Sequence, residues 1–230
     1  MSKIKILVNG ARGKMGQEVI KAVSKEPDME IIAEVDINDD LEQSIKKCAG
    51  AALEPPVVID FTTHKSVMNN IRTAAQNKCH VIVGTTGITE KDLQEIKGLC
   101  EKNGVNVLVA PNFAIGAVLM MKYSADAAKY MPKAEIIELH HDQKLDAPSG
   151  TALKTVEMMK KSSGIKDIPI HSVRLPGLVA NQEVIFGGLG QTLTIKHETI
   201  GRESFMPGVI LAAKKIKGLI GLTCGLESVL

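Results

Sequence analysis

The residues IKILVNGARGKMGQEVIKAV (4–23) decide the fold. Residues 4–9 form a short apolar run, and a glycine-rich turn joins it to apolar residues at helical spacing. Glycines in such a turn let a diphosphate approach the backbone, and the first turn of the helix presents N–H groups to it. Arg12 occupies the place of the second glycine in the commoner G-x-G-x-x-G pattern, so the spacing is G-x-x-G-x-x-G. The stretch predicts a strand, a turn and a helix at a dinucleotide diphosphate, and a tight turn without a ligand is the alternative.

Asp36 favours the dinucleotide interpretation. It ends the apolar run 30–36, about twenty residues after the glycines, where an acidic side chain accepts hydrogen bonds from the adenosine ribose. A solvated turn aspartate is the other interpretation, and the position of Asp36 at the end of an expected strand argues against it.

The rest of the first half alternates between strand-like and helix-like segments. Apolar β-branched runs separated by amphipathic segments indicate a parallel sheet with helical crossovers, which is a Rossmann-type doubly wound α/β fold. Two turns, 84–87 and 110–113, follow expected strands, where such sheets bind ligands. The expected strands are 4–9, 30–36, 57–61, 80–83 and 105–109, and the expected helices are 16–26, 41–48, 66–77 and 90–102.

After Pro111 the pattern changes to that of a smaller α+β domain with an open mixed sheet. A last helix is expected to return to the first domain. The expected helices are 117–130, 151–161 and 209–217, with a strand at 134–140 and several strands between 171 and 199. The predicted division is 1–113 plus 209–230 for dinucleotide binding, and 114–208 for substrate binding and oligomerisation.

The segment HHDQKLDAPSGT (140–151) places two histidines and a lysine beside a helix start. The Ser-Gly-Thr sequence presents backbone N–H groups and a positive dipole to an anion. If the preceding strand continues unbroken, His140 and Lys144 share a face and His141 points away. We therefore expect His140 and Lys144 at the reaction centre and His141 on the substrate. N-capping by Ser149 and solvated surface histidines are the structural alternative.

Composition limits the partners. The net charge is +2 and aromatic residues make up 3% of the chain, so neither nucleic acid nor a membrane surface is an expected partner. No stretch approaches the roughly 20 apolar residues of a membrane span, and the start does not resemble a signal peptide. The four scattered cysteines fit reduced thiols in the cytoplasm and give no sign of a metal site.

Several blocks together resemble one enzyme family. The stretches VIDFT (58–62), VGTTG (83–87), APNFAIG (110–116) and HHDQKLDAPSGTA (140–152) are similar to signature blocks of the dihydrodipicolinate reductases. The resemblance runs from the first strand to the last helix. It implies reduction of 4-hydroxy-tetrahydrodipicolinate, a small cyclic dicarboxylate, to tetrahydrodipicolinate with NADH or NADPH, in diaminopimelate and lysine biosynthesis. It also implies a homotetramer.

The resemblance implies roles for individual residues. His140 matches a proton donor or acceptor, Lys144 matches a proton donor, and the substrate-binding positions are His141, Gly150 and Thr151. The dinucleotide positions are Gly10, Ala11, Arg12, Gly13, Lys14, Met15 and Asp36, and, on the nicotinamide side, Gly84, Thr85, Thr86, Ala110, Pro111, Asn112 and Phe113.

The chain departs from the family pattern at two places. Residues 37–56 look short, and Ile37 stands where family members that use NADPH often have arginine. Asp36 repels a 2′-phosphate, whereas Arg12 and Lys14 attract one. We therefore expect both cofactors to be used, with NADH modestly favoured.

Two other functions fit parts of the pattern. One is another small NAD(P)-dependent dehydrogenase, such as an amino-acid dehydrogenase. The other is a non-catalytic dinucleotide sensor, although the cationic pair beside a helix start argues against it. The β-rich stretch 184–199 carries apolar residues on more than one face, which predicts a homo-oligomer. These residues are Val184, Ile185, Phe186, Leu193 and Ile195.

Overall fold

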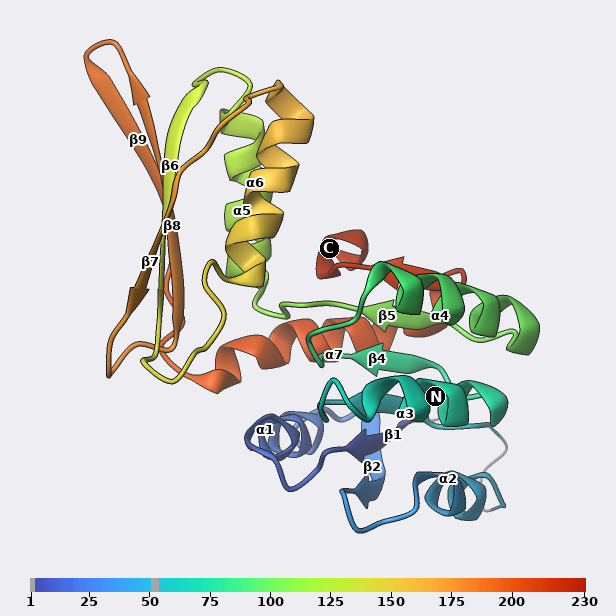
Figure 1. Cartoon of the computed structure of the whole chain (residues 1–230). Coiled ribbons are helices and arrows are strands. Elements are labelled where there is room, and N and C mark those ends of the chain that lie inside the picture. The colour runs from blue at the N-terminus through green and yellow to red at the C-terminus, as the bar shows by residue number, and fades with distance from the viewer. Residues whose placement is uncertain (1–2, 51–53) are drawn as a thin grey trace. The chain divides into compact units, whose positions relative to one another are not determined.

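The computed structural model describes residues 3–50 and 54–230, and its chain folds into two compact units (Figure 1). One unit comprises the described residues up to Phe113 together with Phe205–Leu230, and the other is Ala114–Ser204. None of the described helices is both long and apolar enough to cross a membrane.

The first unit is built on a parallel sheet with the strand order β10-β5-β4-β3-β1-β2. Because the order reverses between β1 and β3, the carboxyl ends of these two strands flank the switch point at which doubly wound sheets bind ligands. The strands are β1 (Ile4–Asn9), β2 (Met29–Val35), β3 (Val57–Asp60), β4 (Val81–Val83), β5 (Val107–Val109) and β10 (Leu222–Cys224).

Helices cover both faces of this sheet. Leu7 packs in one core with residues of α2, α3 and α4, whereas its neighbours Ile6 and Val8 point to the opposite face and are also fully buried. Helix α1 packs against α7 (Figure 1). The helices are α1 (Lys14–Val23), α2 (Leu41–Gly50), α3 (Val67–Gln76), α4 (Glu90–Asn103) and α7 (Met206–Lys215), with 3₁₀ turns η1 (Arg202–Phe205), η2 (Ile216–Gly218) and η3 (Leu226–Val229).

Strand β10 was not predicted. It has three residues between Gly221 and Gly225, both at positive φ, and it pairs in parallel with β5. Its pairing partner lies more than a hundred residues earlier, so no local pattern signals it. The returning chain thus adds an edge strand to the sheet as well as the expected helix.

The second unit is a mixed sheet in the order β7-β6-β8-β9, packed on one face against a helix pair. β7 runs parallel to β6, and the other pairs are antiparallel. Its elements are α5 (Ile115–Ala127), β6 (Lys133–His140), α6 (Gly150–Ser163), β7 (Ile170–Arg174), β8 (Ala180–Gly188) and β9 (Gln191–His197). The predicted fold class, a Rossmann-type sheet with a smaller open mixed sheet, is confirmed.

The apolar residues of the stretch 184–199 are distributed less evenly over the two faces of the sheet than the sequence predicted. Val184 and Phe186 are fully buried on the face that packs against α5 and α6, and their cross-strand partners Ile195 and Leu193 share that face. Ile185 lies on the opposite face. Four of the five residues predicted to be spread over two faces therefore belong to the helix-covered one.

Candidate active site

The turn between β1 and α1 leaves no room for a side chain at two of its glycines. A Cβ atom on Gly10 would lie 2.6 Å from the carbonyl oxygen of Phe61, and one on Gly16 would lie 2.1 Å from that of Gly10. Gly10 also has a φ of +83°, which favours glycine. Among the described residues, no side chain caps α1 at Gly13 and no acidic residue stands in its first turn. The start of α1 therefore suits the phosphates of a dinucleotide.

Asp36 follows β2 and lies against this turn. Its carboxylate accepts hydrogen bonds from the backbone N–H groups of Ile37 (2.8 Å) and Arg12 (2.7 Å), and these lower the pKa of Asp36. The Arg12 guanidinium lies 3.0 Å from the carboxylate of Asp39, which also accepts a hydrogen bond from the backbone N–H of Asp36 (2.9 Å). The acid expected at the ribose thus adjoins the loop, and Arg12 already has an anionic partner.

The turns after β4 and β5 meet the segment that follows β3. A Cβ atom on Gly84 would lie 2.0 Å from the ring of Phe61, so this glycine lets the ring pass. The backbone N–H of Ala110 donates to the carbonyl of Val83 (3.1 Å), and the rings of Phe61 and Phe113 lie 5.8 Å apart. The structure therefore brings the predicted residues of both turns to the carboxyl edge of the sheet.

Asp60, at the end of β3, joins these segments and is fully buried. One carboxylate oxygen accepts hydrogen bonds from the amides of Asn9 and Asn70, both at 2.8 Å. The other accepts from the hydroxyls of Thr62 (2.8 Å) and Thr85 (3.0 Å). The sequence reasoning did not assign Asp60 to the site, although a charged residue that ends an otherwise apolar strand was the available signal.

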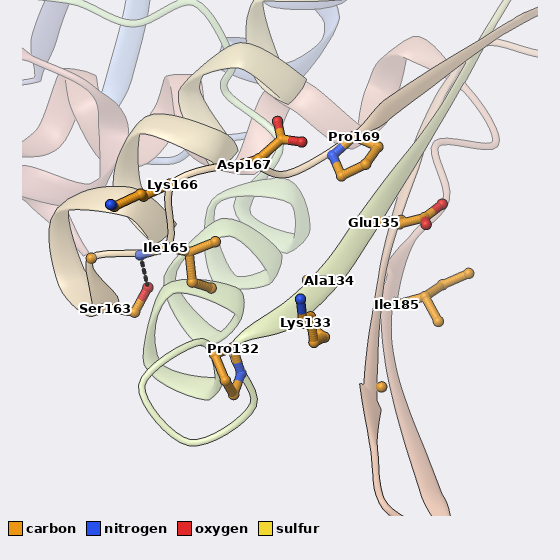
Figure 2. Close-up of a pocket in the computed structure, with 12 residues that line it drawn as sticks. Pro132, Lys133, Ala134, Glu135, Ser163, Ile165, Lys166, Asp167, Pro169 and Ile185 are labelled. Carbon is orange, nitrogen blue, oxygen red and sulfur yellow. Dashed lines mark hydrogen bonds between the residues drawn. The ribbon is translucent and has the colours of Figure 1, made fainter.

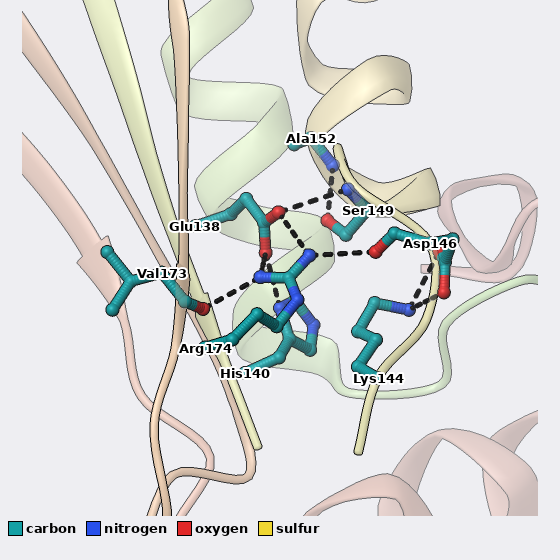
Figure 3. Close-up of polar contacts among 8 residues, drawn as sticks. All are labelled: Glu138, His140, Lys144, Asp146, Ser149, Ala152, Val173 and Arg174. Atoms are coloured by element: carbon teal, nitrogen blue, oxygen red, sulfur yellow. Dashed lines mark hydrogen bonds and ion pairs between the residues drawn. The ribbon is translucent and has the colours of Figure 1, made fainter. Parts of the chain in front are cut away.

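In the second unit, Glu138 is the centre of a polar network (Figure 3). Its side chain has no solvent exposure, and its Oε2 lies 2.5 Å from Nδ1 of His140. Arg174 donates from Nη1 to Oε2 (2.9 Å) and from Nη2 to Oε1 (2.7 Å). The backbone N–H of Ser149 also donates to Oε1 (3.3 Å). The register of the sheet explains the cluster. Glu138 and His140 lie on the same face of β6, and Arg174 in β7 is the direct neighbour of His140, so all three side chains share that face.

The network sets the charge of its members. Burial raises the pKa of Glu138, but hydrogen bonds from Arg174, Ser172 and His140 outweigh it, so the net pKa is lowered and the group is a carboxylate. Burial lowers the pKa of His140, and the attraction of Glu138 only partly opposes it. His140 is therefore neutral at pH 7, and its Nδ1–H group donates a hydrogen bond to the carboxylate of Glu138.

The reason given from the sequence for pairing His140 with Lys144 was wrong. β6 ends at His140, and a turn follows in which the backbone N–H of Lys144 donates to the carbonyl of His141 (3.2 Å). Figure 3 nevertheless shows the side chains of His140 and Lys144 at the same end of the network. The Lys144 ammonium lies 2.7 and 2.8 Å from the two carboxylate oxygens of Asp146, and Arg174 donates to the carbonyl of Asp146 (2.8 Å).

The start of α6 completes the group. The hydroxyl of Ser149 accepts a hydrogen bond from the backbone N–H of Ala152 (3.2 Å), so Ser149 is indeed an N-cap. A Cβ atom on Gly150 would meet no described atom within 4 Å, and the backbone there does not require glycine. Gly150 is exposed, and open space beside the first turn of a helix suits a carboxylate. Within the described ranges, no cluster of histidine, cysteine and acidic residues could hold a metal ion.

The pocket in Figure 2 lies elsewhere in the second unit. Its volume is about 810 Å³, and it lies between the start of β6, the loop after α6 and β8. Its charged lining residues are two lysines and two acids: Lys133, Glu135, Lys166 and Asp167. None of the predicted site residues is among its lining residues, and none of the residues drawn in Figure 3 is either.

Comparison with known proteins decides the family. The model of the dihydrodipicolinate reductase N-terminus matches residues 4–113, and that of the C-terminus matches residues 116–230.

The chain belongs to the dihydrodipicolinate reductase family.

Relatives support this over the full length. The 4-hydroxy-tetrahydrodipicolinate reductase of Desulfitobacterium hafniense (strain DSM 10664 / DCB-2) is 43% identical over 266 residues, which covers all of both chains. That of Syntrophomonas wolfei is 44% identical and covers 99% of each chain. A solved dihydrodipicolinate reductase from Paenisporosarcina sp. TG-14, with dipicolinate bound, superposes with a TM-score of 0.84 at 38% identity, covering 99% of this chain and 100% of the other.

As a member of the dihydrodipicolinate reductase family, the chain is an oxidoreductase. It reduces 4-hydroxy-tetrahydrodipicolinate to tetrahydrodipicolinate with NADH or NADPH, in diaminopimelate and lysine biosynthesis. The family assignment made from the sequence is therefore confirmed, and the amino-acid dehydrogenase and sensor alternatives are not supported. The roles of individual residues stay predictions. The sequence did not single out Asp60, Glu138 or Arg174, which the structure places in these polar networks.

Proposed function

We propose that the start of α6 binds a carboxylate of the cyclic substrate and that the loops of the first unit hold the dinucleotide. The observation that carries the proposal is the open position at Gly150, beside the N-cap of α6 and the network of His140, Glu138 and Arg174. The relative from Paenisporosarcina is described with dipicolinate, a cyclic dicarboxylate, which supports the same ligand class here. His141, which follows β6 directly, and Thr151 are the further substrate contacts in this proposal.

The first unit fits a dinucleotide. The diphosphate is assigned to residues 10–15 at the start of α1, and the adenosine ribose to Asp36. The nicotinamide side is assigned to residues 84–86 and 110–113, which the ring of Phe61 and the carboxylate of Asp60 hold at one edge. When bound, the reduced nicotinamide supplies a hydride to the substrate ring.

Lys144 is the proton donor in this proposal. Reduction adds one hydride and one proton to the ring, and one water leaves. His140 is neutral and donates a hydrogen bond from its Nδ1–H group to Glu138, so Nε2 is an acceptor. The ammonium group of Lys144 is oriented by the carboxylate of Asp146. Lys144 therefore donates the proton to the ring carbon next to the one that receives the hydride, and it is reprotonated from solvent. His140 orients the reacting groups.

An assay with freshly generated substrate tests these roles. We expect Lys144→Ala and His140→Gln each to lower kcat by about 10²-fold, the usual effect of losing a group that transfers or orients a proton. The Kd of the dinucleotide, measured by fluorescence, should stay within about twofold. Since His140 acts in its neutral form, wild-type kcat should rise with pH through its lowered pKa. Wild-type kcat in both variants, or activity that falls as pH rises through that range, would contradict the assignment.

The quaternary state and compartment complete the proposal. A homotetramer formed through the second unit fits the uncovered face of its sheet, and the cytoplasm fits the free cysteines Cys79 and Cys100, both buried. Light scattering and cell fractionation are the direct measurements.

A further inference from the structure

We propose that Glu138 is a positioning residue for the reaction: its carboxylate fixes the ring of His140 through Nδ1, and Arg174 holds that carboxylate and ties it to the loop that carries Lys144. The inference rests on the proposed roles of His140 and Lys144. It adds two side chains that act through these residues and that touch neither substrate nor cofactor in the proposal.

The hydrogen bonds of Glu138 connect three separate segments. Oε2 takes the hydrogen bond of His140 at the end of β6, and Oε1 takes that of the Ser149 backbone at the start of α6 (Figure 3). Arg174 in β7 bridges the two oxygens and reaches the carbonyl of Asp146 with Nη2. The histidine, the proposed carboxylate site and the lysine loop thus share a single buried anchor.

Stability alone does not explain this arrangement. Placing a carboxylate and a guanidinium in a site where Glu138 has no exposure and the Arg174 side chain has 18% costs desolvation that their attraction barely repays. An apolar pair of similar volume would join β6 and β7 about as well. An apolar pair, however, could not accept the hydrogen bonds of the His140 ring and the Ser149 backbone, nor donate one to the carbonyl of Asp146, so the charged pair serves to hold these groups in place.

The hydrogen bond defines which nitrogen of His140 faces the ligand. With Nδ1–H directed to Oε2 of Glu138, Nε2 is the nitrogen that remains for the ligand, and the ring cannot flip without breaking a 2.5 Å contact. The carboxylate also raises the pKa of His140 against the effect of burial. Loss of the charge should therefore both loosen the ring and lower that pKa further.

The test is a set of variants analysed together: Glu138→Gln, His140→Gln and the double variant. Glu138→Gln keeps the shape and removes the charge. We expect it to lower kcat by about 10- to 100-fold, on the scale of a lost general acid–base contact, and to move the acidic limb of the kcat profile to lower pH. In the His140→Gln background the same change should lower kcat by a clearly smaller factor than in the wild type, because part of the effect of Glu138 passes through His140.

The titration of His140 provides a readout that needs no turnover. The NMR signal of the His140 ring can be followed in histidine-labelled protein and assigned through its loss in His140→Gln. It should titrate at lower pH in Glu138→Gln than in the wild type. An unchanged titration overturns the proposal, and so does an equal loss of kcat in both backgrounds. Wild-type kcat in both Lys144→Ala and His140→Gln would instead overturn the proposed function, while the titration still decides the coupling of Glu138 to His140.

Controls separate positioning from folding. Glu95→Gln removes a carboxylate that makes a similar pair of bonds with Arg72 (2.5 and 2.9 Å) on the surface of the first unit, and it should change neither kcat nor the titration of His140. If Glu138→Gln alone does not fold, Glu138→Gln with Arg174→Gln leaves no unpaired buried charge and takes its place. We expect this double variant to show the same loss of kcat and the same downward shift of the His140 titration. A wild-type kcat or a wild-type titration in it would overturn the proposal.

Discussion

At the scale of single residues, we expect the charges around Asp36 to influence the choice between NADH and NADPH. Asp36 and Asp39 place two carboxylates beside the glycine loop, and Asp39 holds the guanidinium of Arg12 at 3.0 Å. Arg12 is therefore not the freely moving cation that the sequence suggested for a 2′-phosphate. Ile37, at 92% exposure, adds no charge. The balance favours NADH more than the sequence alone indicates.

Asp39→Asn should shift this preference towards NADPH. Removal of the carboxylate releases Arg12 to meet a 2′-phosphate and deletes one repulsive charge. One exposed charge contributes on the order of 1 kcal/mol, which is about fivefold, so the NADPH-to-NADH ratio of kcat/KM should rise by at least about fivefold. Binding of 2′-phospho-ADP-ribose, measured by calorimetry, should strengthen in parallel.

Asp40→Asn is the matched control. Asp40 is next in sequence and caps the backbone N–H of Gln43 (3.0 Å), a task that asparagine also performs. It should leave the cofactor ratio unchanged. An equal shift in both variants would mean that general charge, and not the release of Arg12, sets the preference.

At the scale of elements, the start of α6 offers a test in which stability and binding separate. Gly150 opens the helix, is not at positive φ and has open space beside its Cβ position in the described chain. Gly150→Ala should therefore keep or raise stability, by up to about 0.5 kcal/mol, through a lower entropy of the unfolded chain. The added methyl group would obstruct a carboxylate on the backbone N–H groups, so KM for the substrate should rise at least about tenfold.

Gly98→Ala in α4 is the comparison. An added Cβ there also meets no described atom, and the position is helical, so stability should rise by about 0.5–1 kcal/mol while KM stays constant. Urea unfolding gives the first quantity and steady-state kinetics the second. An unchanged KM in Gly150→Ala would place the carboxylate elsewhere.

What the sequence could predict follows from how local each signal is. The glycine turn, Asp36 and the start of α6 are contiguous patterns, and the structure places each at the element end expected for it. Glu138 and Arg174 stand 36 residues apart and meet only through the register of β6 with β7. Asp60 likewise gathers donors from β1, α3 and the turn after β4. Sites built from side chains on different strands need the sheet register before they can be recognised.

At the scale of the whole molecule, the second sheet presents one face that α5 and α6 leave uncovered. Alternation along the strands puts Ile137, Leu139, Val173 and Ile185 on that face, and each is only partly buried. The pocket of Figure 2 includes Ile185 and Glu135 of the same face. We expect these apolar residues on an open sheet face to belong to an interaction surface.

Ile185→Lys should weaken assembly through this face. Stable interfaces bury about 1,600 Å² in total, and a lysine at position 185 would bring a charge that has to lose its water when a second subunit covers this face. We expect wild-type protein at micromolar concentration to have the mass of a tetramer by light scattering, and Ile185→Lys to have a lower mass with an unchanged fold by circular dichroism. Ile220→Lys, at a 94% exposed position in the first unit, is the control and should keep the wild-type mass. A monomeric wild type, or a tetramer that Ile185→Lys leaves intact, would show that the uncovered face does not join the subunits.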